Sequence, residues 1–228
     1  MSVGPAGRTA SPARPSFGAA IRFLARVLIV SGVLLLADAG TTLAWQEPVS
    51  ALLTAREQSE LEEQLESLPA PRRAGQLGAA RLEALADRWE RRTGRGEAFG
   101  RIELPTLERD YAVVEGTDQA SLHSGPGHYP ETGLPGQPGT VGIAGHRTTY
   151  LAPFRTIDEL ERGDEIVVEM PYARFTYRVQ KQQIVEPSQT EVVDDVGYPR
   201  LVLSACHPLY SAAQRIVVFA RLDEVRPA

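Results

Sequence analysis

From Phe99 onward, the sequence is a series of short segments rich in Val, Ile and Tyr, each bounded by Gly, Pro or Asp. This composition and spacing predict β-strands joined by turns. Only residues 153–160 have the character of a helical turn in this part of the chain. Many short strands with few helices predict a mainly β domain that closes, or nearly closes, into a barrel, because closure removes exposed strand edges. The expected strands are residues 101–104, 111–115, 140–144, 165–170, 175–185, 201–205 and 215–222.

The composition excludes several classes of function. The chain has 228 residues and a formal net charge of -5, which argues against a nucleic-acid partner because phosphate binding requires a basic surface. Cys206 is the only cysteine, so an internal disulfide is excluded. The absence of a second cysteine and of a paired histidine motif leads us to expect no metal and no cofactor. The four histidines are His123, His128, His146 and His207.

The N-terminal part of the chain predicts a membrane anchor. Residues 1–22 are expected to be a disordered cytoplasmic tail, and residues 23–45 contain an apolar run long enough to cross a bilayer. Arg22 and Arg26 precede this run, which places the N-terminus in the cytoplasm and the rest of the chain outside the cell. A cleaved signal peptide is the alternative, because residues 37–39 resemble a cleavage site. Both interpretations export the body of the protein.

Residues 46–98 are expected to form a helical stalk and linker. Leucines recur at helical spacing in residues 55–68 and again in residues 79–92. A proline-rich stretch at residues 69–71 separates the two runs, and residues 71–78 read as a linker. The remaining domain, residues 99–228, then carries the function.

Three residues with the chemistry of thiol acyl transfer stand at ends of expected strands: Cys206, His146 and Arg215. If these strands are neighbours, the three side chains meet at one rim of the barrel. Only the thiolate of a cysteine attacks a carbonyl carbon, and nearby cationic groups favour that form. The histidine could then protonate a departing amine, whereas the arginine stays charged and could hold the developing oxyanion. The alternative is that Cys206 is a buried apolar residue with a purely structural role.

Six short motifs between residues 99 and 222 form one recognisable pattern. They are residues 127–130 (Gly-His-Tyr-Pro), 142–147 (Gly-Ile-Ala-Gly-His-Arg), 152–154 (Ala-Pro-Phe), 160–164 (Leu-Glu-Arg-Gly-Asp), 203–208 (Leu-Ser-Ala-Cys-His-Pro) and 211–217 (Ser-Ala-Ala-Gln-Arg-Ile-Val). With these motifs the region resembles the sortases, membrane-anchored cysteine transpeptidases of Gram-positive cell surfaces; the pattern most resembles the class E sortases of actinobacteria, with class D the near neighbour. The resemblance implies an eight-stranded β-barrel, with Cys206 as the nucleophile, His146 as the catalytic histidine and Arg215 as the family's arginine.

Four residues near these three are candidates for substrate binding: Ser204, Ala205, His207 and Arg147. Sortases usually carry Thr directly before the cysteine, where this chain has Ala205. Ser204 and Ala205 point to opposite sides of a strand, so Ser204 cannot simply supply the missing hydroxyl. The Gly- and Pro-rich loop of residues 123–139 is either a solvated connector or a wall of the substrate groove.

The resemblance implies a reaction and its partners. Cys206 would cleave the Thr-Gly bond of a C-terminal sorting signal of the Leu-Pro/Ala-x-Thr-Gly kind and form a thioester with the surface protein. An amine of the cell wall or of another protein would then accept that protein. Two alternatives stay open: a membrane-anchored cysteine peptidase, in which water resolves the thioester, and a non-catalytic barrel that binds a surface partner.

Overall fold

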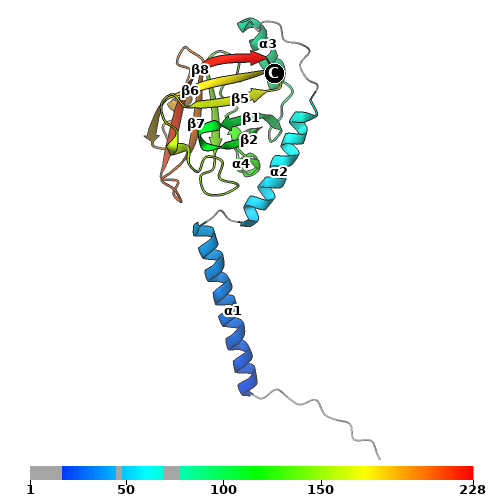
Figure 1. Cartoon of the computed structure of the whole chain (residues 1–228), viewed down its shortest axis with the longest axis vertical. Helices are drawn as coiled ribbons and strands as arrows, with labels where there is room; N and C mark the ends of the chain where they lie inside the picture. Colours follow the sequence, from blue (N-terminus) through cyan, green and yellow to red (C-terminus); the bar gives the residue numbers. More distant parts are fainter. Residues whose placement is uncertain (1–16, 45–47, 69–77, 228) are drawn as a thin grey trace, which may run out of the picture. The chain divides into compact units, whose positions relative to one another are not determined.

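The computed structural model describes residues 17–44, 48–68 and 78–227. The chain divides into two compact units, Met1–Ala44 and Trp45–Ala228 (Figure 1). Most of the predicted disordered tail and of the predicted linker after the first stalk helix lies outside the described residues.

The first unit contains one long helix, α1 (Phe17–Ala44). Its apolar segment Ala20–Gly40 is 21 residues long, which is sufficient by length and composition to cross a membrane. The helix starts six residues before the expected anchor, so residues 17–22 are helical rather than disordered. Ala20 and Arg22 are strong helix formers and extend the helix outward from the apolar run.

The second unit is built around a closed barrel of eight strands. Their order around the barrel is β1-β2-β3-β4-β7-β8-β6-β5, and β5 pairs with β1 to close it. All neighbours are antiparallel except β2 with β3 and β4 with β7. The strands are β1 (Ala98–Leu104), β2 (Arg109–Glu115), β3 (Gly127–His128), β4 (Thr140–Gly145), β5 (Glu165–Met170), β6 (Ala173–Val185), β7 (Arg200–His207) and β8 (Gln214–Pro227).

The predicted barrel is confirmed, but two of its elements were not expected. The strand β3 has two residues and the helix α4 (Gln119–Ser124) has six, so neither is long enough to show a periodic pattern. The expected helical turn at residues 153–160 is a short 3-10 helix, Ile157–Glu159. Two further 3-10 turns, Pro105–Leu107 and Thr190–Val193, were also not expected.

Side chains alternate between the two faces of β7, and this alternation separates two apolar clusters. Leu201, Leu203 and Ala205 belong to the main core inside the barrel. Val202 lies on the outer face and packs with Val217 and other residues of a second cluster. The outer cluster is covered by Val192 and Val193 of the turn between β6 and β7. Burial on both faces explains why β7 is a nearly continuous apolar run.

Two helices that precede the barrel pack against it: α2 (Pro48–Glu66) and α3 (Ala79–Glu90). Leu82 and Ala86 of α3 join the main core. Leu61 of α2 packs in a smaller cluster with Ala112 and other residues of β1 and β2. The two expected helical runs therefore form helices that cover the barrel, and their action as a stalk stays a prediction.

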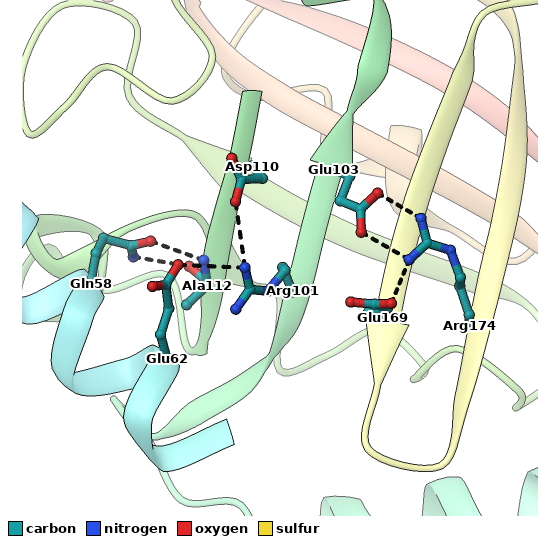
Figure 2. A network of polar contacts seen from close by, with 8 residues as sticks. All are labelled: Gln58, Glu62, Arg101, Glu103, Asp110, Ala112, Glu169 and Arg174. Atoms are coloured by element: carbon teal, nitrogen blue, oxygen red, sulfur yellow. Dashed lines mark hydrogen bonds and ion pairs between the residues drawn. The ribbon is translucent and has the colours of Figure 1, made fainter. Parts of the chain in front are cut away.

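Polar contacts fix α2 and close the barrel (Figure 2). Gln58 of α2 accepts a hydrogen bond from the Ala112 amide at 2.9 Å and donates to the Ala112 carbonyl at 3.0 Å. At the seam between β1 and β5, Arg174 of β6 donates to both carboxylate oxygens of Glu103 and also pairs with Glu169. One guanidinium thus joins three strands where the barrel closes.

Candidate functional site

The strand register brings His146, Cys206 and Arg215 to one end of three adjacent strands. Gly145 of β4 lies opposite Ala205 of the parallel strand β7, so the next residue, His146, is level with Cys206. On the other side of β7, Arg215 of β8 is the direct partner of Cys206. Neighbouring strands are about 5 Å apart, which places the three residues within reach of one substrate. The catalytic roles themselves stay a prediction.

The backbone at His146 is held by Phe154. The Phe154 amide donates a hydrogen bond to the His146 carbonyl at 3.0 Å, and the Phe154 ring is fully buried. A Cβ atom on Gly145 would lie 2.5 Å from this ring, so only glycine permits the close approach. The Ala-Gly-His sequence and the Ala-Pro-Phe sequence therefore act together to fix the position of His146.

The imidazole of His146 is partly buried. Its Nε2 atom is buried and has no hydrogen-bond partner within the described part of the chain. Burial lowers the pKa of His146 below its ordinary value of 6.5, and the positive charge of His123 lowers it further. An unpaired buried nitrogen is unfavourable in a folded protein and is typical of functional sites. At neutral pH His146 is therefore mainly uncharged.

Cys206 is partly exposed, so its thiol is accessible rather than sealed in the core. Cross-strand partners point to the same face of a sheet, and this places Arg215 on the side of the thiol. The guanidinium donates hydrogen bonds to the carbonyls of Ala212 and Gln214, each at 3.0 Å. These contacts hold the cationic group at the start of β8, beside Cys206.

A cavity of about 110 Å³ lies next to Arg215 on the outer face of β7 and β8. Ser204 and Val217 form its floor, and the segment between β6 and β7 forms one wall. Arg200 holds this wall by donating to the carbonyls of Val192 and Asp194 at 2.9 and 2.8 Å. The cavity is mostly apolar but contains the carboxylates of Glu131 and Glu186.

Two of the four predicted substrate-binding residues lie on opposite faces of β7. Ser204 lines the cavity, and its hydroxyl forms a 2.8 Å hydrogen bond with the hydroxyl of Tyr129. Ala205 points into the barrel and belongs to the main core. A larger residue at position 205 would therefore press on the core rather than on the cavity. The substrate-binding roles of both residues stay predictions.

The other two, Arg147 and His207, form a network at the end of the barrel. The Arg147 side chain is 2% exposed and pairs with Asp158 at 2.6 Å. It also donates to the Arg155 carbonyl and to Nδ1 of His207, the latter at 3.3 Å. Since a guanidinium only donates, Nδ1 of His207 accepts, and the ring proton is on Nε2. Arg147 is thus buried, while His207 lines a separate cavity with Asp158; their binding roles stay predictions.

The sequence did not reveal two neighbours of His146, namely Tyr150 and His123. The His146 and Tyr150 rings have centroids 5.1 Å apart, and the Tyr150 and His123 rings are stacked at 4.0 Å. No periodic pattern marks either residue, because both lie in or beside loops. In the part of the chain that the structure describes, no three His, Cys, Asp or Glu side chains gather as a metal site.

Comparisons with known proteins agree with this architecture. A family model described as "Sortase domain" matches residues 102–223. The chain is 32% identical over 130 residues to the Sortase D of Bacillus subtilis, covering 55% of this chain and 64% of that protein. It is 34% identical over 148 residues to Sortase SrtE1 of Streptomyces coelicolor, covering 58% of this chain and 42% of that protein. The chain thus spans less than two thirds of the length of either relative.

The solved structure of sortase E from Streptomyces avermitilis matches with a TM-score of 0.55 and 33% sequence identity. The match covers 59% of this chain and 93% of that structure. The match therefore includes nearly all of that structure and leaves part of this chain outside it. The sortase family model matches more than half of the 228 residues of this chain, so the chain belongs to the sortase family.

Proposed function

We propose that this protein is a membrane-anchored cysteine transpeptidase that transfers surface proteins to an amine of the cell wall. The observation that supports it most is the strand register, in which His146, Cys206 and Arg215 occupy one end of β4, β7 and β8. A thiol, an imidazole and a fixed cation are the groups that acyl transfer through a thioester requires. The membership of the sortase family agrees with this chemistry.

In the first half of the reaction, the Cys206 thiolate attacks the carbonyl carbon of the Thr-Gly bond in the sorting signal. The carbonyl oxygen becomes an oxyanion, which the guanidinium of Arg215 stabilises. His146, whose neutral imidazole takes up the thiol proton as the Cys206 thiolate forms, then gives that proton to the glycine nitrogen, and the C–N bond breaks. A thioester then joins Cys206 to the surface protein, while the fragment that begins with glycine leaves.

In the second half, a primary amine attacks the thioester carbon. His146 is now neutral and accepts the proton that the amine loses. The C–S bond breaks and restores the thiolate of Cys206. The product is a new amide bond between the surface protein and the acceptor, and no external energy source is required because one amide replaces another.

The substrate is proposed to be the C-terminal sorting signal of an exported protein, with the sequence Leu-Pro/Ala-x-Thr-Gly. The cavity beside Arg215 has an apolar lining and a volume of about 110 Å³, which suits one aliphatic side chain of such a peptide. We propose that α1 spans the membrane with the N-terminus in the cytoplasm and the barrel outside, where sorting signals and wall amines occur.

The test is mass spectrometry of the full chain after incubation with Leu-Ala-x-Thr-Gly and Leu-Pro-x-Thr-Gly peptides, with and without an amine acceptor. An acyl adduct on Cys206 and an amine-linked product are expected. Cys206→Ala and Arg215→Lys should lower the rate by at least about a hundredfold, whereas Arg221→Lys, on the same strand but away from the site, should not. Hydrolysis alone, with an amine present, would instead indicate a peptidase.

A further inference from the structure

Three aromatic rings lie in contact in a row that ends at His146, with the first two stacked and the third tilted; this row is called the stack below. The His123 and Tyr150 rings are 4.0 Å apart with an interplanar angle of 17°, and the Tyr150 and His146 rings are 5.1 Å apart with an angle of 40°. His123 belongs to α4, and Tyr150 belongs to the loop after β4. The Tyr150 ring therefore lies against one side of the His146 imidazole.

The backbone at Tyr150 is held in an unusual conformation. Tyr150, Leu151 and Ala152 have φ angles of 51°, 61° and 44°, all in the left-handed region. Residues with a Cβ atom rarely adopt φ angles in this region. Such a backbone conformation persists only where surrounding contacts enforce it. Ala152 is buried, and its amide donates to the Thr149 carbonyl at 2.8 Å. These contacts therefore fix the backbone of the loop and, with it, the position of the Tyr150 ring.

The other end of the stack is tied to α2. The Thr54 hydroxyl donates a hydrogen bond to the His123 carbonyl at 2.9 Å, and the Gln58 side chain donates to the Ser124 carbonyl at 2.7 Å. Both side chains are buried, with 2% and 7% exposure. A Cβ atom on Gly125, the residue directly after α4, would lie 2.2 Å from the Gln58 amide nitrogen. Hence α4 fits closely against α2.

Gln58 also fixes α2 to the barrel, because its amide group binds both backbone groups of Ala112 in β2 (Figure 2). One buried side chain thus connects α2, α4 and the barrel wall. Buried hydrogen bonds of this kind are costly to leave unmade, so they define a single position of α4.

We propose that α2 positions His146 through α4, with His123 and Tyr150 as the positioning residues that transmit this contact to the imidazole. The consequence for catalysis rests on the proposed function. The position and dynamics of the imidazole, by contrast, can be measured without any turnover. A helix that the sequence marks only as part of a stalk would then be part of the active enzyme.

The groups that titrate or carry charge around His146 come from four elements. His123 lies on α4, Tyr150 on the loop after β4, Cys206 on β7 and Arg215 on β8. Burial and the charge of His123 lower the pKa of His146. Loss of the stack exposes the His146 ring to water and moves the charge of His123 away from it. Both changes raise the pKa of His146 toward 6.5.

The experiment compares the full chain in detergent micelles with three variants. Thr54→Val/Gln58→Leu removes both bonds to α4, His123→Ala removes the ring, and His123→Phe keeps a stacked ring without the charge. Glu62→Gln is the control. Glu62 is one helical turn after Gln58 in α2, and it forms an ion pair with Arg101 of the barrel rather than with α4. The histidine ring signals are followed by NMR with labelled histidine, and His146→Gln identifies the signal of His146.

In the parent chain the His146 signal should titrate below 6.5, the ordinary value. His123→Ala and the double variant should raise this pKa, broaden the signal and lower kcat for peptide cleavage about tenfold, with KM little changed, because a misplaced acid slows the chemical step. The acidic limb of the pH profile of kcat/KM should move to higher pH by the same amount as the pKa of His146 rises. His123→Phe should raise the pKa but keep most of the kcat.

The proposal is overturned if the double variant and His123→Ala leave the His146 signal, its titration and kcat as they are in the parent chain. It is also overturned if Glu62→Gln changes them equally, because a general loosening of α2 would then be the cause. If the parent chain cleaves no sorting peptide, the proposed function fails, whereas the NMR comparison still decides whether α2 positions His146.

Discussion

At the scale of single residues, the position of His146 depends on the absence of a side chain at the preceding residue, Gly145. Gly145 precedes it and has no side chain, and the Phe154 ring occupies the space where a Cβ atom would be. The histidine therefore leaves β4 at a point where the loop after it folds tightly back on the strand. Small residues before a functional group often have this purpose, since they allow a backbone to approach another part of the structure closely.

Gly145→Ala is expected to lower both stability and activity. The added methyl group would lie 2.5 Å from the Phe154 ring, so the ring or the strand must shift. Overpacking of this kind costs about 1–3 kcal/mol of unfolding free energy. Urea unfolding and peptide cleavage by the same preparations measure the two effects. Gly94→Ala is the control, because the nearest atoms in the described part of the chain belong to the flexible Glu97 side chain, 3.5 Å from the added group; equal losses in both variants would contradict the explanation.

At the scale of elements, the barrel is closed by β5 pairing with β1 over only three residue pairs. The guanidinium of Arg174 supplements this short pairing, since it binds Glu103 of β1 and Glu169 of β5 from its place on β6. Figure 2 shows the three side chains converging at the seam. The hydrogen bonds to Glu103 hold the pKa of the Arg174 guanidinium above its ordinary value.

Arg174→Met is expected to destabilise the barrel by about 1 kcal/mol, because the ion pairs are partly exposed and water screens them. The Arg174 side chain is 34% exposed, which is consistent with a moderate effect. Thermal unfolding at low and high salt measures it, and the difference from the parent chain should shrink at high salt. Arg226→Met should change little, since among the residues that the structure describes Arg226 forms an ion pair only with Glu224 of its own strand. A loss that does not depend on salt would contradict an electrostatic origin.

At the scale of the whole molecule, the chain consists of two compact units with different tasks. The first carries an apolar helix that can cross a membrane, and the second contains the barrel, its covering helices and the candidate site. Holding an enzyme and a membrane-bound substrate at one surface raises their effective concentration without any new contact. The anchor would therefore act on the encounter and not on the chemistry.

Removal of residues 1–44 is expected to leave kcat for a soluble sorting peptide unchanged. Transfer of a surface protein that is itself held in the membrane should fall by a factor of about 100, in line with the loss of a tethered encounter. Reconstituted vesicles with the intact and shortened chains measure both rates, and Cys206→Ala versions give the background. A fall in soluble peptide cleavage would mean that the first unit also affects the site.

Much of the barrel and of the candidate site can be predicted from the sequence. Each of the seven expected strands is found, because alternating apolar residues and the Gly and Pro between them are local signals. Cys206, His146 and Arg215 were identifiable because each follows or begins such a strand. By contrast, β3 and α4 are too short to show a period, and the helix α1 begins earlier than the composition suggested.

The sequence by itself determined the strands, the apolar anchor segment and the three residue types of the candidate site, since these depend on neighbours along the chain. Only the tertiary structure decided that Arg147 is buried against Asp158, that Ser204 faces the cavity, and that Tyr150 and His123 stack toward His146. Ser204 meets its partner Tyr129 across 75 residues of sequence, and the rings of His123 and Tyr150 come from different elements. Such contacts depend on how β7, α4 and the loop after β4 are brought together, so the local pattern of residues does not encode them.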